Sequence, residues 1–519
     1  MAAPVRGIWR SAQEDPARIA LVDAQGARVS AGELVAHANQ LVHALRARGA
    51  APGDVIATLL PNGAPMLEVL AATMQAGWYV TPLNTHLAAA EIAYVLRDSG
   101  AVAFVAHERY AEQARRAAEE AGLPAHARHA VGRIEGFGSY AETLAAAPAT
   151  APAERRAGQF LQYTSGTTGR PKGIKRPLGA AADADAQAIG YARASLGRFG
   201  IEPGGDGVFL VTSPMYHTAP LAYGWFALNF DYRLVMMDAW DSERALALIE
   251  AQRVTATHMV PTQFHRLLQL PDATKRRYDT RSLRHVLHAA APCPPEVKRR
   301  MLAWWGPVVY EYYGATEGGG TLATPEQWLR FPGTVGTAWE GHEVRIYDDE
   351  GKLCAPGQVG TVYLKLMGDF EYRGDSDKTR KNRIGNFFTV GDVGWLNEEG
   401  FLFLCDRKID MIISGGVNIY PAEIEAALLE HPAVGDVAVF GIPDEEWGEQ
   451  VKAVVEPAPG SEPSERLAGA LLEHCLERLA KYKCPRSIDF STALPRDPNG
   501  KLYKRLLREP YWQGRERRI

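Results

Sequence analysis

Over most of the chain, short apolar runs alternate with stretches in which apolar residues recur every three or four positions. The first pattern is typical of strands and the second of amphipathic helices. Their alternation predicts a mainly parallel sheet with helices on its faces. The predicted strands are Val55–Leu60, Tyr79–Thr81, Ala101–Ala106, Val208–Thr212, Ala256–Val260, Val286–Ala290 and Val308–Tyr312, and the predicted helices include Met66–Gln75, Ala89–Arg97 and Ala245–Gln252.

One helix has a start signal that can be read directly from its residues. Ser30 is followed three positions later by Glu33, and apolar residues then recur at helical spacing from Leu34. This is the sequence of a capping box, in which the serine and glutamate side chains satisfy backbone N–H groups reciprocally. Gly49 predicts the end of that helix.

The pattern changes in the last third of the chain. Val344–Tyr347, Gly360–Leu366 and Phe401–Cys405 alternate in polarity and are separated by Asp-Glu-Gly and Glu-Glu-Gly turns, which predicts antiparallel strands. From Ile412 a last segment of roughly 110 residues has enough helix and strand pattern for a small α+β domain with its own core. The predicted fold class is therefore α/β, with a large N-terminal domain and a small C-terminal one.

The amino-acid composition is ordinary, but it argues against several classes of protein. Of 519 residues, 46% are hydrophobic and 23% charged, as in an ordinary soluble globular protein. A formal net charge of −4 without a dense basic stripe argues against nucleic-acid binding. Five scattered cysteines without a C-x-x-C motif favour a reducing cytosol over a disulfide framework or zinc site. The N-terminus does not resemble a signal peptide, and no apolar run approaches the ~18 residues of a membrane span, so a cytoplasmic location is expected.

The stretch Tyr163–Arg176 (YTSGTTGRPKGIKR) combines hydroxyl side chains and glycines with one lysine. Such a loop offers many backbone N–H groups and little bulk, which suits a polyphosphate. It is not a Walker A loop, because Lys172 is followed by Gly173 rather than Ser or Thr. A solvated linker is the alternative, although linkers rarely follow an apolar run such as Phe160-Leu161. The candidate phosphate ligands are Thr164, Ser165, Gly166, Thr167, Thr168, Gly169 and Lys172.

Five motifs in order resemble those of the adenylate-forming superfamily, especially its bacterial acyl-CoA synthetases. The motifs are YTSGTTGRPKG, YYGATEG, TVGDVGWLNEEGF, DRKIDMIISGGVNIYPAEIE and LPRDPNGK. The resemblance covers nearly the whole chain. It implies stacked βα subdomains and a small β-barrel-like part in residues 1–406, a hinge at 407–410, and a mobile α+β domain at 411–519. It also implies two reactions at one site, formation of an acyl-adenylate from ATP and a carboxylic acid, and then transfer to coenzyme A.

The resemblance assigns the nucleotide contacts. Tyr313 would stack on adenine opposite a wall of small residues, and Thr316 would donate to the α-phosphate. Glu317 would hold Mg²⁺, since that cation prefers carboxylate oxygen. Asp392 would accept both ribose hydroxyls, with Arg407 assisting. The remaining residues of the predicted nucleotide site are Ala290, Ala291, Pro292, Tyr312 and Gly314.

The same resemblance assigns the catalytic and coenzyme A residues. Lys501 would stabilise negative charge on the attacked phosphorus, and His217 would lie between the acyl pocket and the coenzyme A tunnel. Ser414, Gly415 and Gly416 would leave room in that tunnel for the thiol arm. Trp447 and Lys481 are further candidate contacts for coenzyme A.

One position departs from the family pattern. The family commonly places Asp or Lys two residues after the arginine of the hinge motif, whereas this chain has Ile409 there. Domain closure requires only a few residues that absorb changes in φ and ψ, so the departure does not exclude domain rotation. It leaves the pivot residue open.

The substrate acid is only partly constrained. Residues near His217, Tyr223, Gln263 and His288 are expected to line the acyl pocket, and the run Gly318-Gly319-Gly320 favours a roomy one. A fatty, aromatic or alicyclic acid is therefore expected rather than acetate or an amino acid. The acceptor could also be an amine or a carrier-protein thiol, and a catalytically silent nucleotide-binding protein is a further alternative. Both a monomer and a homodimer remain open.

Overall fold

The computed structural model describes residues 6–164, 171–178, 184–204, 206–365, 370–373, 376–497 and 500–513. The chain divides into two compact units, which interleave along the sequence. Unit 1 consists of residues 1–258, 271–286 and 368–381, and unit 2 consists of residues 259–270, 287–367 and 382–519. The domain boundaries predicted at residues 406 and 411 stay a prediction.

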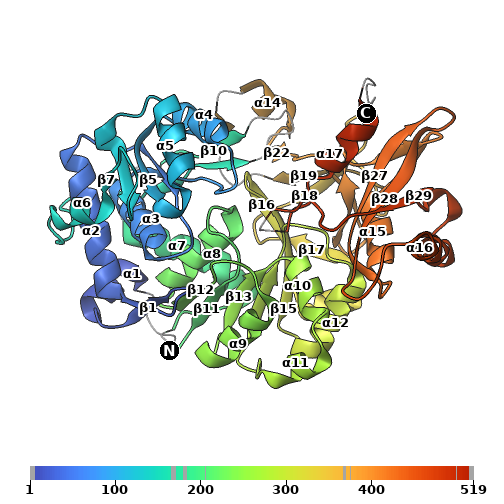
Figure 1. Cartoon of the computed structure of the whole chain (residues 1–519), viewed down its shortest axis with the longest axis horizontal. Helices are drawn as coiled ribbons and strands as arrows, with labels where there is room; N and C mark the ends of the chain where they lie inside the picture. Colours follow the sequence, from blue (N-terminus) through green and yellow to red (C-terminus); the bar gives the residue numbers. More distant parts are fainter. Residues whose placement is uncertain are drawn as a thin grey trace. The chain divides into compact units, whose positions relative to one another are not determined.

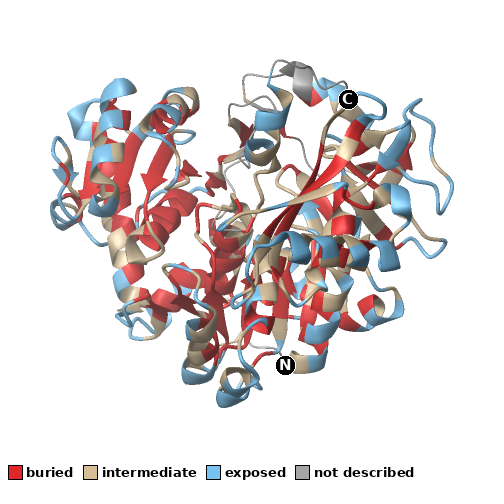
Figure 2. Ribbon diagram, turned by 45° about the vertical axis from the view of Figure 1, so that its right-hand side comes forward, coloured by how far each residue is buried: buried red, intermediate tan, exposed pale blue. Residues whose placement is uncertain are grey.

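Unit 1 contains the predicted parallel sheets. Its six-stranded sheet has the order β7-β6-β5-β3-β4-β8, and every neighbouring pair is parallel. Helices connect consecutive strands and bury their apolar faces on the sheet (Figures 1 and 2). The elements are β3 (Val55–Leu59), α3 (Ala64–Ala76), β4 (Tyr79–Pro82), α4 (Ala89–Ser99), β5 (Ala101–His107), α5 (Ala111–Glu120), β6 (Arg128–Val131), β7 (Gly138–Ser139), α6 (Tyr140–Ala145) and β8 (Gln159–Phe160).

A second group of strands in unit 1 has the order β2-β1-β12-β11-β13. All its neighbouring pairs are parallel except β1 with β2, which form an antiparallel pair. The elements are α1 (Gly7–Glu14), β1 (Ile19–Val22), β2 (Arg28–Ser30), α7 (Ala184–Leu196), β11 (Val208–Val211), α8 (Thr218–Asn229), β12 (Arg233–Met236), α9 (Ser242–Gln252), β13 (Ala256–Met259) and α11 (Asp272–Arg277). The strands β1 and β12, each four residues long, were not among the predicted strands.

The predicted capping box is confirmed at the start of α2 (Ala31–Ala47). The Ser30 Oγ accepts a hydrogen bond from the Glu33 N–H at 3.2 Å, and the Glu33 carboxylate accepts from the Ser30 N–H at 2.9 Å. The helix ends two residues before Gly49.

Unit 2 contains the predicted antiparallel strands, in the order β15-β16-β17-β24-β23-β19-β22-β21. Strand β15 is longer than the pattern predicted, because it continues beyond Tyr312 and pairs with β16. The elements are β14 (His285–His288), α10 (Pro261–Leu268), α12 (Pro295–Trp305), β15 (Val309–Ala315), β16 (Gly318–Ala323), α13 (Pro325–Arg330), β17 (Thr334–Ala338), β18 (Val344–Tyr347), β19 (Gly360–Lys365), β21 (Arg383–Ile384), β22 (Phe387–Phe388), β23 (Asp392–Leu396) and β24 (Leu402–Arg407), where the first two residues of β14 belong to unit 1.

The last part of unit 2 is the predicted α+β fold. Two long strands, β27 (Val434–Asp444) and β28 (Gly448–Pro457), form a hairpin whose buried face packs against α15 (Pro421–Leu429) and α16 (Glu465–Arg478). The remaining elements are β25 (Ile412–Ser414), β26 (Val417–Ile419), β29 (Ser487–Phe490) and α17 (Lys504–Arg508). Among the described residues, no helix has the length and apolar character to cross a membrane.

Candidate active site

The Gly/Ser/Thr motif connects two short strands of unit 1. These are β9 (Gln162–Thr164) and β10 (Lys172–Lys175), in which Thr164 pairs with Lys172. Lys172 is therefore fixed by a backbone ladder at the base of the loop. Gly173 lies beside it under the Tyr163 ring, where a Cβ would be a tight 3.0 Å from the ring. The predicted ligands Ser165, Gly166, Thr167, Thr168 and Gly169 lie outside the described residues.

In unit 2, the two residues Thr316 and Glu317 form the turn between β15 and β16. The predicted nucleotide contacts Tyr312, Tyr313 and Gly314 precede this turn on β15 itself. The Glu317 side chain is largely buried, with 8% exposure. One hairpin therefore carries the predicted base-stacking ring, the predicted α-phosphate donor and the predicted metal ligand.

Asp392, the predicted ribose ligand, lies beside two other predicted site residues. It begins β23, and its carboxylate accepts a hydrogen bond from the Tyr313 hydroxyl at 2.7 Å. The Arg407 Nε is 3.5 Å from the other carboxylate oxygen. Burial, and then the Asp392 charge, raise the pKa of Tyr313 well above its ordinary value. The Tyr313 hydroxyl therefore stays protonated and acts as a donor at neutral pH.

The small-residue wall, Ala290-Ala291-Pro292, begins two residues after the end of β14 at His288. Ala290 has a φ of +77°, in the left-handed region that non-glycine residues rarely adopt. Behind this segment the Lys298 ammonium lies 2.9 Å from the Glu311 carboxylate, and both side chains are buried. Sequence reasoning missed this buried ion pair, although Glu311 stands within the apolar run Val308–Tyr312, which is a usable signal of a buried carboxylate.

The open space that was predicted beside Gly318, Gly319 and Gly320 is partly filled by other side chains. A Cβ at Gly320 would lie 2.5 Å from the Trp339 ring, and one at Gly314 would lie 3.4 Å from it. The expectation that these glycines open the acyl pocket is therefore wrong at Gly320, where the missing side chain accommodates an indole. Gly318 faces open space, since a Cβ there would have no neighbouring heavy atom within 4 Å.

His217 lies at the N-terminal boundary of α8 in unit 1. The segment before it is held by Asn62, which lies shortly after β3 and to which the sequence analysis gave no role. The Asn62 amide donates to the Ser213 carbonyl at 3.1 Å and the Met237 carbonyl at 2.9 Å, and its oxygen accepts from the Met215 N–H at 2.8 Å. The Pro-Asn-Gly sequence therefore positions the His217 segment.

Three residues expected near the acyl pocket have structural contacts instead. Tyr223 is buried and stacks on His258, with ring centroids 5.5 Å apart. The Gln263 side chain accepts a hydrogen bond from the Val260 N–H and caps α10. His288 is fully buried, and its Nε2 lies 3.5 Å from the Glu311 carboxylate. His288 itself therefore lies in the core around Glu311, and the expectation that residues near it line the acyl pocket stays a prediction.

Ser414, Gly415 and Gly416 form the tight turn from β25 to β26. Both glycines have positive φ, of +58° and +78°, as a two-residue hairpin turn requires. A Cβ at Gly415 would lie 2.4 Å from the Trp447 ring, so the space above this glycine is filled by Trp447 rather than open. The expected room for a thiol arm is therefore absent at Gly415. Lys481 lies exposed in the short helical turn Lys481–Lys483.

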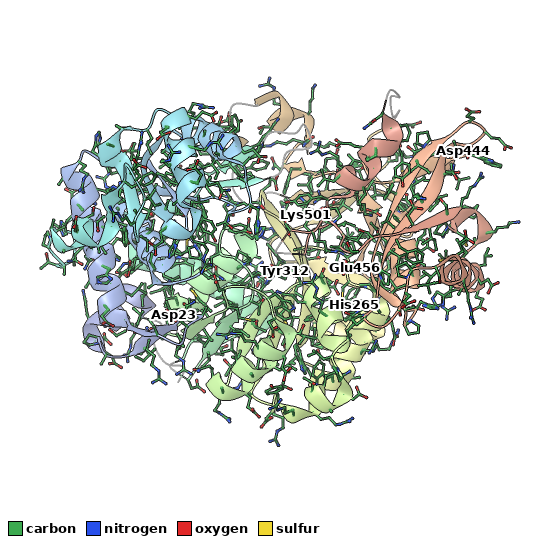
Figure 3. The ribbon with its side chains drawn as sticks, viewed as in Figure 1. Asp23, His265, Tyr312, Asp444, Glu456 and Lys501 are labelled. Carbon is green, nitrogen blue, oxygen red and sulfur yellow. The ribbon has the colours of Figure 1, made fainter. Side chains whose placement is uncertain are left out.

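Lys501 follows Gly500 in a turn near the end of unit 2, where Figure 3 labels it. Burial lowers the pKa of its ammonium, and the charge of Arg407 lowers it further, while Asp497 and Asp410 partly offset both effects. The predicted catalytic lysine and the predicted ribose-binding arginine are therefore within electrostatic reach of each other. This places Lys501 on the same side of unit 2 as Asp392.

The hinge motif is held by its charged neighbours. The Lys408 ammonium lies 2.5 Å from the Asp349 carboxylate, and Arg508 of α17 lies 3.7 Å from the Asp410 carboxylate. Arg508 also donates to the Ile409 carbonyl at 3.4 Å. The charge that the family pattern places at 409 is absent, and Lys408 and Asp410 carry ionic contacts on either side of it.

Within unit 2, the buried carboxylates, the tyrosine hydroxyl and the neighbouring cations form a site suited to a nucleoside phosphate. A family model of AMP-binding enzymes matches residues 8–368, and one of the C-terminal domain of these enzymes matches residues 423–501. The chain therefore belongs to the AMP-binding enzyme family.

Similar proteins span the full length of the chain. A long-chain-fatty-acid–CoA ligase of Mycobacterium tuberculosis is 34% identical over 489 residues, which cover 93% of each chain. A fatty acid–[acyl-carrier-protein] ligase of Streptomyces coeruleorubidus is 31% identical, covering 98% of this chain and 96% of that protein. The solved structure of ATP-bound MatB from Rhodopseudomonas palustris is 31% identical, with a TM-score of 0.80 and 96% of each chain covered.

Proposed function

We propose that this enzyme joins a fatty, aromatic or alicyclic acid to coenzyme A through an acyl-adenylate, using the residues named below. The observation that carries the proposal is the arrangement around Asp392. Its carboxylate is held by the Tyr313 hydroxyl at 2.7 Å and faces Arg407 at 3.5 Å. A carboxylate is an acceptor only, so a ribose with two adjacent hydroxyl donors is the ligand that this arrangement fits.

The first step is attack by a carboxylate oxygen of the acid on the α-phosphorus of ATP. The bond from this phosphorus to the oxygen that bridges to the β-phosphate breaks, and pyrophosphate leaves. Lys501 stabilises the negative charge that accumulates on the five-coordinate phosphorus, and Thr316 donates to an α-phosphate oxygen. Lys172 neutralises charge at the pyrophosphate end.

The second step transfers the acyl group. The thiol of coenzyme A loses its proton to water, and its sulfur attacks the acyl carbonyl carbon. The bond from that carbon to the phosphate oxygen breaks, and AMP leaves with the bonding electrons. His217 lies beside the reacting carbonyl, and Trp447 and Lys481 contact the nucleotide part of coenzyme A.

Glu317 is suited to hold Mg²⁺ during the first step. Its carboxylate is buried in the β15–β16 turn, one residue after Thr316. Magnesium is commonly bound by one or two carboxylates together with substrate phosphates. The bound ion would neutralise phosphate charge, while Glu317 itself orients the turn that presents Thr316.

An apolar acid is favoured over an amino acid. Ser213, not an aspartate, precedes Pro214 in the segment before His217, so that segment has no carboxylate to bind an α-amino group. The relative from M. tuberculosis is named as a ligase of long-chain fatty acids. That name supports a fatty acid among the three classes.

A second candidate differs only in the acceptor. The relative from S. coeruleorubidus is named as a ligase that transfers to an acyl-carrier protein. Transfer to a carrier-protein thiol would use the same adenylate and the same Lys501.

A panel of acids distinguishes these functions. Octanoate, palmitate, benzoate, ferulate, cyclohexanecarboxylate, acetate and alanine would each be tested for acid-dependent exchange of pyrophosphate into ATP, and then for AMP release with and without coenzyme A. We expect exchange with at least one larger apolar acid and faster AMP release when coenzyme A is present. Exchange without stimulation by coenzyme A would support a carrier protein or amine instead, and no exchange with any acid would refute both candidates.

A further inference from the structure

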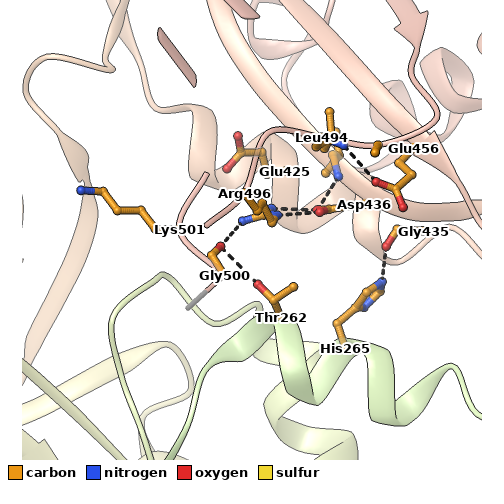
Figure 4. A network of polar contacts seen from close by, with 12 residues as sticks. Thr262, His265, Glu425, Gly435, Asp436, Glu456, Leu494, Arg496, Gly500 and Lys501 are labelled. Atoms are coloured by element: carbon orange, nitrogen blue, oxygen red, sulfur yellow. Dashed lines mark hydrogen bonds and ion pairs between the residues drawn. The ribbon is translucent and has the colours of Figure 1, made fainter. Parts of the chain in front are cut away.

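Arg496 makes three side-chain hydrogen bonds beside the Lys501 loop (Figure 4). Its Nε and Nη2 donate to the two carboxylate oxygens of Asp436 on β27, at 2.6 and 2.7 Å. Its Nη1 donates to the Gly500 carbonyl at 2.6 Å. One planar guanidinium therefore joins the central hairpin of the α+β part to the residue immediately before Lys501.

The segment between Arg496 and Lys501 is closed on itself. The Asp497 N–H donates to the Lys501 carbonyl at 2.9 Å, and the Asp497 carboxylate accepts from the Lys501 N–H at 2.9 Å. Arg496 and Leu502 face each other as an antiparallel bridge at the base of the turn. Because the carbonyl carbon of Gly500 is bonded to the nitrogen of Lys501, fixing the Gly500 carbonyl also fixes where Lys501 begins.

The same carbonyl faces α10 of unit 2. The Thr262 hydroxyl lies 3.5 Å from the Gly500 oxygen, and a Cβ at Gly500 would lie 2.8 Å from that hydroxyl. The His265 Nε2 lies 2.9 Å from the carbonyl of Gly435, the residue before Asp436. Helix α10 thus contacts the loop at Gly500 and strand β27 at Gly435, the residue before Asp436, so the Arg496–Asp436 pair supports a loop that is docked against this helix.

Burial makes this pair more than a surface contact. The side chains of Arg496 and Asp436 are only 17% and 13% exposed. Bidentate arginine–carboxylate pairs combine charge with fixed geometry, and a lysine cannot reproduce the three-donor fork. The Lys501 ammonium extends away from the pair (Figure 4), so the pair holds the backbone of the loop and does not engage the ammonium itself.

We propose that Arg496 is a positioning residue for adenylation, which acts by fixing the Gly500 carbonyl and thereby the reach of Lys501. This inference rests on the adenylation role proposed for Lys501. Arg496 does not touch the reacting atoms, so its effect passes through Lys501. It should therefore be absent from the thioester step, in which Lys501 is not used.

A double-mutant cycle tests this directly. Arg496→Ala, Lys501→Ala and the double variant would be compared in acid-dependent pyrophosphate exchange, with the panel acid that gives the highest rate. A displacement of about 1 Å can cost roughly 10²-fold, so Arg496→Ala should lower adenylation by about that factor. In the Lys501→Ala background the same substitution should have almost no further effect, because the group that it positions is gone.

Thioester formation provides the internal control. Each variant would be given the synthetic adenylate of the same acid together with coenzyme A, and Arg496→Ala should stay within about threefold of wild type. Arg496→Lys, which can reach Asp436 or Gly500 but not both, should show an intermediate loss and serves if Arg496→Ala does not fold. Arg478→Ala is the matched control, since Arg478 of α16 pairs with Glu430 at the end of α15, and its side chain is 40% exposed.

The outcomes separate the inference from its premise. Equal losses by Arg496→Ala in both half-reactions, or full additivity with Lys501→Ala, would show a merely structural role and overturn the inference. A normal adenylation rate for Arg496→Ala and Arg496→Lys would also overturn it. If Lys501→Ala itself adenylates normally, the proposed role of Lys501 fails, whatever Arg496 does.

Discussion

Lys172 and Lys501 both stand next to a glycine in a polar loop, but different forces hold them. Lys172 begins β10, and its backbone pairs with Thr164 in an antiparallel ladder. Lys501 lies outside any strand or helix. Besides backbone hydrogen bonds such as that between Asp497 and Lys501, its turn is held by two side chains: the Asp497 carboxylate accepts from the Lys501 N–H, and Arg496 donates to the Gly500 carbonyl. A ladder is maintained by the backbone itself, whereas a side-chain contact can be lost with a single substitution.

This difference fits the tasks proposed for the two lysines. A residue that binds the pyrophosphate end needs a permanent place. A residue that acts in only one of two steps benefits from contacts that can be made and released together. The comparison predicts that single side-chain changes away from the lysine disturb Lys501 more than Lys172.

The largest effect is expected from removing the Lys501 ammonium. Lys501→Ala should lower adenylation by about 10³-fold, because a preorganised charge facing the developing negative charge is lost. Thioester formation from a supplied adenylate should change less than about threefold. Pyrophosphate exchange and single-turnover thioester assays measure the two halves. Equal losses in both would remove the distinction between the two lysines.

Lys172→Ala should have a smaller effect, mainly on nucleotide binding. A lost charge-assisted hydrogen bond to a phosphate corresponds to a roughly tenfold higher KM for ATP. Lys175→Ala is the matched control on the same strand, since Lys175 is exposed and lies over the Tyr79 ring, 5.3 Å from its centroid. A fall in kcat as large as that of Lys501→Ala would contradict the comparison.

Tyr313 has both kinds of support, a backbone ladder and a side-chain hydrogen bond, and Tyr313→Phe removes only the second. Strand β15 holds its backbone, while its hydroxyl donates to Asp392 at 2.7 Å. The variant keeps the ring and loses the hydrogen bond, so we expect the KM for ATP to rise about fivefold, which corresponds to ~1 kcal/mol. Tyr310→Phe on the same strand controls for general effects on β15. No change in KM would mean that Asp392 does not need this donor.

The sequence was most informative where the determining contacts are local. The Ser30–Glu33 capping box involves neighbours three residues apart, and the structure has both of its hydrogen bonds. The turn at Thr316–Glu317 was not foreseen, because it depends on the pairing of β15 with β16 rather than on a turn signal.

Long-range partners limited the prediction of the site. The acidic partner of Arg496 lies 60 residues earlier, and the spacing of neither residue reveals the other. The space above Gly415 and Gly320 is likewise decided by Trp447 and Trp339, which the glycine-rich motifs do not include. Residue roles could therefore be proposed from the motifs, while the groups that position them required the fold.

Acid should weaken the docked Lys501 loop slightly and leave the Lys172 ladder unaffected. Burial lowers the pKa of His265 below its usual 6.5; the Asp436 charge and the Gly435 carbonyl oppose this, and Arg300 and Arg496 add to it. Below pH 6.5 the undocked histidine gains a proton more readily than the docked one, so docking becomes less favourable as the pH falls towards the lowered pKa. The segment from β9 to β10 contains no histidine.

Lowering the pH from about 7.5 to about 5.5 should therefore slow adenylation by a factor that is roughly threefold larger in wild type than in His265→Gln, whose amide can still donate to the Gly435 carbonyl. Parallel pH profiles of pyrophosphate exchange for the two proteins measure this difference, and superimposable profiles would show that His265 does not link protonation to docking.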